Sequence, residues 1–178
     1  MGIITRNFAN NILSGGTIDA TDGIDGAIPS SNVGNSSVTN ITNAAIGPFG
    51  FGTQTAAVGA GGYSNTNTVL NTTEEYDGST WTAGGVMNTF RRGLGGAGTQ
   101  TAAIGFGGAP YPTTTGATEL YDGSTWTNST SMTTARYGLG GAGTQTAALG
   151  FGGFGPPNSN ATEEFTGAFL SVKKVTTS

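Results

Sequence analysis

The sequence contains no histidine and no cysteine among its 178 residues. Histidine is the usual general base near neutral pH and the commonest metal ligand, so its absence removes Ser-His-Asp and Cys-His catalysis. Without cysteine there are no disulfide bonds and no thiolate metal sites. Catalysis by carboxylates alone stays conceivable. We expect no enzyme, no catalytic residues, no bound metal and no cofactor.

Charged residues and long apolar runs are scarce as well. Charged residues make up 9% of the chain, with a net charge of −4, whereas an average protein contains about 25%. The basic residues are scattered, so we expect no surface that binds nucleic acid. No apolar run has the length that membrane insertion needs, and no secretion signal is visible. Stability must therefore come from packing, backbone hydrogen bonds and partners.

Glycine is abundant, with 33 residues, and it recurs in a repeated pattern. The stretch Gly-Thr-Gln-Thr-Ala-Ala begins at Gly52, Gly98 and Gly143, so the period is about 45 residues. The segment YDGSTWT at 76–82 returns at 121–127. A period of about 40 to 50 residues is typical of propeller blades.

Each repeat is predicted to contain four short β-strands, because apolar residues alternate over short runs that Gly, Pro, Asn or Asp-Gly interrupt. In the second repeat the predicted strands are 93–98, 102–107, 118–121 and 124–127. Ile104 and Phe106 share one face of the second strand, while its other face carries only glycine and alanine. A bare face lets a neighbouring sheet approach closely. The Asp-Gly pairs of the YDGSTWT segments fit two-residue hairpin turns.

A family resemblance follows from these landmarks. The order AAIGFGG, a variable loop, TELYDGSTWT, then Met132 and Arg136 resembles the kelch motif, in which a Gly-Gly pair closes one strand and a Tyr and a Trp follow at set distances. The resemblance covers Ala44 to Val175. It implies an all-β, propeller-like fold of kelch-like four-stranded blades, about three per chain. The corresponding units are 44–88, 89–133 and 134–178.

A second resemblance concerns function. The wording GTQTAALGFGG with TEEYDGSTWT, and the opening ITRNFANNI, is similar to virion structural and tail-fibre-like proteins of marine cyanobacterial phages. It implies a non-enzymatic protein located in the phage virion, as a fibre or knob or as a decoration of capsid or tail. The alternative is a lectin-like, carbohydrate-binding propeller module. Kelch enzymes such as galactose oxidase need copper-binding histidines and a tyrosine–cysteine crosslink, which this chain lacks.

Residues 1–43 are predicted to form an N-terminal attachment arm that contacts other virion proteins. Ile4, Phe8 and Ile12 would form one apolar stripe on a short helix, which Gly15-Gly16 would end. The isolated Ile and Val residues that follow are too sparse to build a core, so this segment would gain order only against another surface. A disordered tail is the alternative.

Three blades are too few to close a propeller, since closed rings use about four to eight. The terminal blades would expose apolar faces, so we expect a homo-oligomer. Two copies would supply enough blades for an ordinary ring. The phage resemblance favours a trimer, for example three open stacks packed around a threefold axis. The sequence leaves dimer and trimer open.

Several polar and aromatic residues recur once per repeat. An active site is used once per ring, whereas a packing contact is used once per blade, so we interpret these residues as structural contacts between blades. The arginines would pair with the glutamates or with backbone carbonyls between blades, and the tryptophans would be core residues rather than sugar-stacking ones. The recurring residues are Glu74, Glu119, Glu163, Arg91, Arg136, Trp81 and Trp126.

The repeats diverge in the loops after each Gly-Gly pair, at 63–67, 109–113 and 154–158. Each loop carries an aromatic residue near its start, namely Tyr63, Tyr111 and Phe154. Strands that agree and loops that differ are the usual basis of a binding surface. We therefore predict a ligand site, for a host-surface glycan, at these three aromatic residues; plain solvated connectors are the alternative.

Overall fold

The computed structural model describes residues 40–42, 45–155, 157–166 and 171–175, which all belong to the compact unit Ser37–Ser178. The predicted N-terminal arm, with its short helix, lies outside the described residues except for 40–42. Every regular element within these ranges is a β-strand. None of the described segments is a helix that could cross a membrane.

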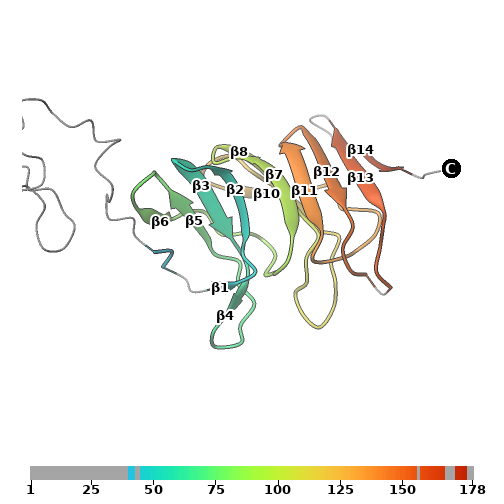
Figure 1. Cartoon of the computed structure of the whole chain (residues 1–178), viewed down its shortest axis with the longest axis horizontal. Coiled ribbons are helices and arrows are strands. Elements are labelled where there is room, and N and C mark those ends of the chain that lie inside the picture. Colours follow the sequence, from blue (N-terminus) through green and yellow to red (C-terminus); the bar gives the residue numbers. More distant parts are fainter. Residues whose placement is uncertain (1–39, 43–44, 156, 167–170, 176–178) are drawn as a thin grey trace, which may run out of the picture. The chain divides into compact units, whose positions relative to one another are not determined.

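Twelve of the strands form three four-stranded antiparallel sheets, here called blades 1, 2 and 3 (Figure 1). Blade 1 consists of β2 (Phe49–Thr53), β3 (Ala56–Ala60), β5 (Thr73–Tyr76) and β6 (Trp81–Ala83). Blade 2 consists of β7 (Gly95–Thr99), β8 (Ala102–Phe106), β9 (Thr118–Tyr121) and β10 (Trp126–Ser129). Blade 3 consists of β11 (Gly140–Thr144), β12 (Ala147–Phe151), β13 (Thr162–Thr166) and β14 (Ser171–Val175).

The first strand of each blade lies beside that of the next, so β2, β7 and β11 adjoin one another (Figure 1). A two-stranded sheet of β1 (Ala45–Ile46) and β4 (Tyr63–Ser64) is added at the loop end of blade 1. The prediction of an all-β protein with four-stranded repeats is thus confirmed. In blades 2 and 3 the strand nearest the neighbouring blades has the sequence GGAGT and is the poorest in side chains, as its glycines predict. In blade 1 the equivalent strand, β2, carries Phe49 and Phe51.

In the second repeat, the predicted bounds match β9 and differ from β8 by one residue at its end. The first strand, β7, begins two residues later than predicted and ends one residue later, and the last strand differs as well. That strand begins at Trp126, two residues later than predicted, because Tyr121 pairs directly with Trp126. The connection therefore has four residues, 122–125, and the predicted two-residue turn is wrong. The physical reason is the Asp122 carboxylate, which accepts hydrogen bonds from the amides of Ser124 and Thr125 and so holds them outside the ladder.

Two apolar clusters fill the spaces between successive blades. Between blades 1 and 2, Val58 and Ala60 pack with Leu94, Tyr121 and Trp126. Between blades 2 and 3 the second cluster has the same pattern and contains Ala97, Ile104, Phe106, Met132, Leu139, Ala148 and Phe165. Blade 1 thus packs Val58 against blade 2, and blade 2 packs Ile104 and Phe106 against blade 3. The core lies between the sheets.

The blades approach closely because glycine backbone faces glycine backbone. A Cβ placed on Gly141 of β11 would lie 2.4 Å from the backbone nitrogen and oxygen of Gly96 in β7. A Cβ on Gly96 would lie 2.1 Å from the backbone oxygen of Ile104 in its own blade and 2.4 Å from Cζ of Phe49 in blade 1. Separations this short are not possible for real atoms, so both positions require glycine for space.

We predict that Gly96→Ala and Gly141→Ala each destabilise the fold by about 1–3 kcal/mol. The Gly96 backbone of the preceding blade blocks a Cβ on Gly141, and the Ile104 carbonyl oxygen with the Phe49 ring blocks one on Gly96. Gly50 is the matched control, because it holds the same repeat position in blade 1 and its Cβ would meet only Val58 oxygen, at 3.7 Å. Urea denaturation of dilute protein should show Gly50→Ala at wild-type stability. Equal losses at all three positions would contradict this explanation.

Candidate functional site

The recurring arginines and glutamates form buried ion pairs. Nη2 of Arg91 lies 3.0 Å from Oε1 of Glu119, and both side chains are fully buried. Arg136 and Glu163 repeat this pair at 3.0 Å in blade 3. The sequence interpretation placed such pairs between blades. The structure places each one inside a repeat, where it fastens the connection entering a blade to that blade's third strand.

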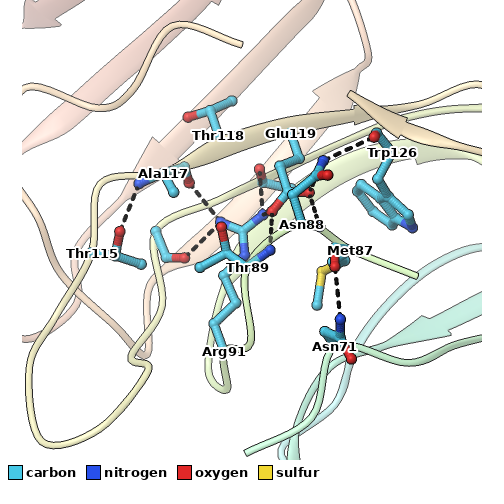
Figure 2. A network of polar contacts seen from close by, with 12 residues as sticks. Asn71, Met87, Asn88, Thr89, Arg91, Thr115, Ala117, Thr118, Glu119 and Trp126 are labelled. Carbon is cyan, nitrogen blue, oxygen red and sulfur yellow. Dashed lines mark hydrogen bonds and ion pairs between the residues drawn. The ribbon is translucent and has the colours of Figure 1, made fainter. Parts of the chain in front are cut away.

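Backbone groups complete the surroundings of the first pair (Figure 2). Nη1 of Arg91 donates to the carbonyl oxygens of Gly107, at 2.9 Å, and Ala117, at 2.6 Å. The Glu119 carboxylate accepts the backbone amides of Asn88, at 2.7 Å, and Thr89, at 3.2 Å. Burial lowers the pKa of Arg91 to about 10 while the charge of Glu119 acts in the opposite direction, so the guanidinium stays charged near neutral pH.

Blade 1 keeps the glutamate and lacks the arginine. Glu74 is 3% exposed and accepts the backbone amide of Thr42 at 2.7 Å, as Glu119 and Glu163 accept the corresponding amides of Asn88 and Thr133. Residue 45, the repeat position of Arg91 and Arg136, is alanine. The glutamate and its amide donor therefore recur in every blade, and the guanidinium recurs in two.

The two tryptophans differ in their surroundings. Trp126 is 5% exposed, stacks on Tyr121 with ring centroids 4.8 Å apart, and donates from Nε1 to Oγ1 of Thr73 in blade 1 at 3.0 Å. It is thus a core residue between blades 1 and 2. Trp81 contacts Tyr76, with ring centroids 5.0 Å apart, but is only half-buried and lines a groove beside blade 1.

The three loop aromatics gather at one end of the blades, where two further residues join them. The Arg92 guanidinium carbon lies 5.0 Å from the ring centroid of Tyr63 and 5.4 Å from that of Tyr111. Tyr137 meets Phe154 edge to face at 5.5 Å. A groove of about 430 Å³ is lined by Arg92, Ala109, Tyr111, Pro112, Thr113, Thr114, Tyr137 and Phe154.

The sequence prediction included Tyr111 and Phe154, which line this groove, but missed Arg92 and Tyr137. Both missed residues directly follow a recurring arginine, at a position where the repeats differ. Arg92 forms a β-bridge with Ala109, and Tyr137 forms one with Phe154. This long-range pairing brings the position to the loop end. The sequence signal that could have identified Arg92 and Tyr137 is that their position differs between repeats while the arginine before it recurs.

The exposed aromatic and cationic surface of the groove is suited to binding. Tyr111 is 64% exposed and Phe154 is 40% exposed. The described residues that line the groove include no acid, so its single charge is the Arg92 guanidinium. Flat rings beside a cation and threonine hydroxyls can stack on an apolar sugar face and hydrogen-bond a polar or anionic substituent.

Comparison with known proteins identifies the fold alone. No protein-family model and no curated protein matches the sequence. Among solved structures 135 chains match. One, titled "Structure of YjhT", superposes with a TM-score of 0.66 at 12% sequence identity and covers 77% of this chain. The present chain spans 47% of that chain's length, and the likeness supports a β-propeller-like, all-β architecture.

The buried pairs lead to a stability prediction. We expect Arg136→Met to lower the free energy of unfolding by about 3–5 kcal/mol, because Glu163 keeps its buried charge without the guanidinium. The double variant Arg136→Met, Glu163→Leu removes both charges and should recover most of the loss. Thermal and urea denaturation measure both effects. A single variant with an unchanged melting temperature would reject the paired role.

The Asp-Gly turns lead to a prediction for acid stability. The amides and hydroxyls of Thr80 and Ser79 hold the pKa of Asp77 below its ordinary value of 3.8, and those of Thr125 and Ser124 do the same for Asp122. A carboxyl with a lowered pKa in the folded state stabilises the fold above pH 3.8 and loses that contribution as the pH falls further.

The variant Asp77→Asn, Asp122→Asn should therefore lose less stability than wild type when the pH is lowered from about 5 to about 2. Urea midpoints at several pH values provide the measurement. Parallel pH profiles for the two proteins would show that these turns do not contribute to acid sensitivity.

Proposed function

We propose that this protein is a non-enzymatic structural component of a phage virion, built from kelch-like blades. Two features support the proposal. The wording of its repeats resembles that of virion proteins. In addition, its buried acids have architectural partners: Glu119 and Glu163 each accept an arginine and backbone amides at the same place in successive blades. A catalytic acid would not be needed at each of these places.

In this proposal the two parts of the chain have separate roles. Residues 1–43 attach the protein to other virion proteins. The blades form the displayed body, either as a fibre or knob or as a decoration of capsid or tail, and are completed by further copies of the chain. The loop end, with its groove, faces outward.

The groove is the observation that carries the binding part of the proposal. Its ligand is a carbohydrate of the host surface, held by stacking on Tyr111 and Phe154, while Arg92 contacts a polar or carboxylate group of the sugar. Tyr63 positions Arg92 through its ring. A displayed structural protein with such a groove would contribute to host attachment.

A second candidate function is a lectin-like propeller module that acts outside a virion. The same groove supports it, because glycan binding does not require a particle. Mass spectrometry and immunogold imaging of purified phage particles separate the two candidates. Detection of the chain in particles supports the structural role, and its absence there combined with glycan binding supports the lectin-like one.

We predict that a glycan array will detect binding by the wild-type protein and that Tyr111→Ala and Phe154→Ala each weaken it about tenfold, the effect of losing about 1.4 kcal/mol of stacking. Phe90→Ala is the matched control, since Phe90 is 54% exposed and does not line the groove. Silence on the array, or equal binding by all three variants, would count against a glycan ligand.

A further inference from the structure

The outward face of blade 3 has the composition of an interface between blades. Leu149 is 40% exposed and Phe151 is 45% exposed. The residues at the same positions of blade 2, Ile104 and Phe106, are 0% exposed because blade 3 covers them. Blade 3 therefore presents in the open the face that blade 2 buries.

The opposite end of the stack presents the complementary face. Ala57, Tyr76 and Trp81 are cross-strand neighbours on one face of blade 1, and they correspond to Ala103, Tyr121 and Trp126, which blade 2 buries against blade 1. A groove of about 640 Å³ lies on this side of blade 1, lined by Ile41, Pro48, Gly50, Ala57 and Trp81 among others.

Two positions on these faces change together from one interface to the next. Between blades 1 and 2, the hydroxyl of Tyr121 donates a hydrogen bond to the carboxylate of Glu75. Between blades 2 and 3, the same positions hold Leu120 and Phe165, and Leu120 packs against the cluster that contains Phe165. The interface between blades 1 and 2 thus has two polar residues at these positions, and the interface between blades 2 and 3 has two apolar ones. Neither interface pairs a polar residue with an apolar one.

The same two positions are polar again on the two terminal faces of the chain, where they hold Glu164 in blade 3 and Tyr76 in blade 1. Glu164 lies beside Leu149 on the outward face of blade 3, as their direct pairing in β12 and β13 shows. Tyr76 is 8% exposed and shares one face of blade 1 with Ala57 and Trp81. We propose that blade 3 of one copy of this chain packs on blade 1 of a second copy, with Tyr76 donating a hydrogen bond to Glu164 of the partner subunit.

A recurring glutamine supports the same arrangement independently. Nε2 of Gln100 donates to the carbonyl oxygens of Ala57 and Tyr76 in the preceding blade, at 3.2 and 2.9 Å. Gln145 makes the equivalent bonds to Ala103 and Tyr121, at 3.1 and 2.7 Å. Gln54 is the third member of this set and is exposed. The corresponding acceptors are the carbonyl oxygens of Ala148 and Phe165 of the partner subunit.

The contact is head to tail, so two copies related by a twofold axis use the outward face of blade 3 and the Tyr76 face of blade 1 in each copy. Their blades together fall within the range of about four to eight found in closed propellers. The YjhT structure has the same fold, and this chain spans 47% of its length, so two copies approach the length of that one chain. The association does not depend on whether the loop groove binds a glycan.

Sedimentation velocity of the full chain over a concentration series tests the proposal. We expect a reversible dimer, which Phe151→Glu weakens about a hundredfold or more by placing a charge in the contact. Val86→Glu is the matched control, because Val86 is 60% exposed, belongs to no strand and does not line the groove beside blade 1, and it should dimerise as wild type does. A wild-type protein that stays monomeric throughout overturns the proposal.

Two conservative variants test the blade 1 side without threatening the fold. Gln54→Glu replaces the donor with an acceptor, and Tyr76→Phe removes the hydroxyl from beside a carboxylate; each should raise the dimer dissociation constant about tenfold or more. The double variant Tyr76→Phe, Glu164→Leu recreates the apolar Leu120–Phe165 combination and should return to within about threefold of wild type. Circular dichroism confirms that each variant is folded.

A mixing experiment establishes the polarity of the contact. Phe151→Glu blocks blade 3 and Gln54→Glu weakens blade 1, so a mixture of the two proteins still contains one unaltered pair of faces. Native mass spectrometry should detect a heterodimer more stable than the Phe151→Glu homodimer. If the variants at Gln54 and Tyr76 dimerise as wild type does, blade 1 takes no part and the head-to-tail contact is rejected.

Discussion

The packing of each blade against its neighbours is the constraint on which the rest of this structure depends. A single four-stranded sheet of three- to five-residue strands has too little core to be stable alone. Val58, Ile104 and Leu149 occupy one position, and their burial follows the presence of a following blade: 1% and 0% exposed in the first two, 40% in the last. Burial is thus set by the neighbour and not by the strand's own sequence.

The buried polar framework determines how the blades are connected more than how stable they are. A buried ion pair gains little over well-packed apolar residues, because desolvation offsets most of the attraction. Arg91 and Glu119 fix the path of the backbone. Their side chains form hydrogen bonds with two carbonyl oxygens and two backbone amides, and so define the path by which the chain enters blade 2. Blade 1 is entered by residues 40–42, and there the glutamate is retained without the arginine.

The sequence predicted the repeat, the strand interiors and the recurring arginine and glutamate residues, because each of these follows from a local sequence pattern. It predicted β9 at its observed bounds from the alternation of Thr118 to Tyr121. It failed at the turn after that strand, where the Asp122 carboxylate captures two amides that the alternation assigned to a strand. It missed Arg92, since its approach to Tyr63 and Tyr111 results from a bridge between distant segments.

Differences between repeats carry the information about partners. A residue retained in every blade serves a contact that every blade makes, as Gln100 and Gln145 do for the carbonyls of the blade before them. A residue that changes serves one contact only. The changes fall at the loop end, where Ile46, Arg92 and Tyr137 share one position. They also fall on the blade faces, where Glu75, Leu120 and Glu164 share another position.

On the blade faces, the residue of the neighbouring blade changes together with its partner: Tyr121 is found with Glu75, and Phe165 with Leu120. Such matched change has a physical reason, since a carboxylate against a phenyl ring would be buried without a donor. The same reason makes Tyr76 and Glu164 suited to each other.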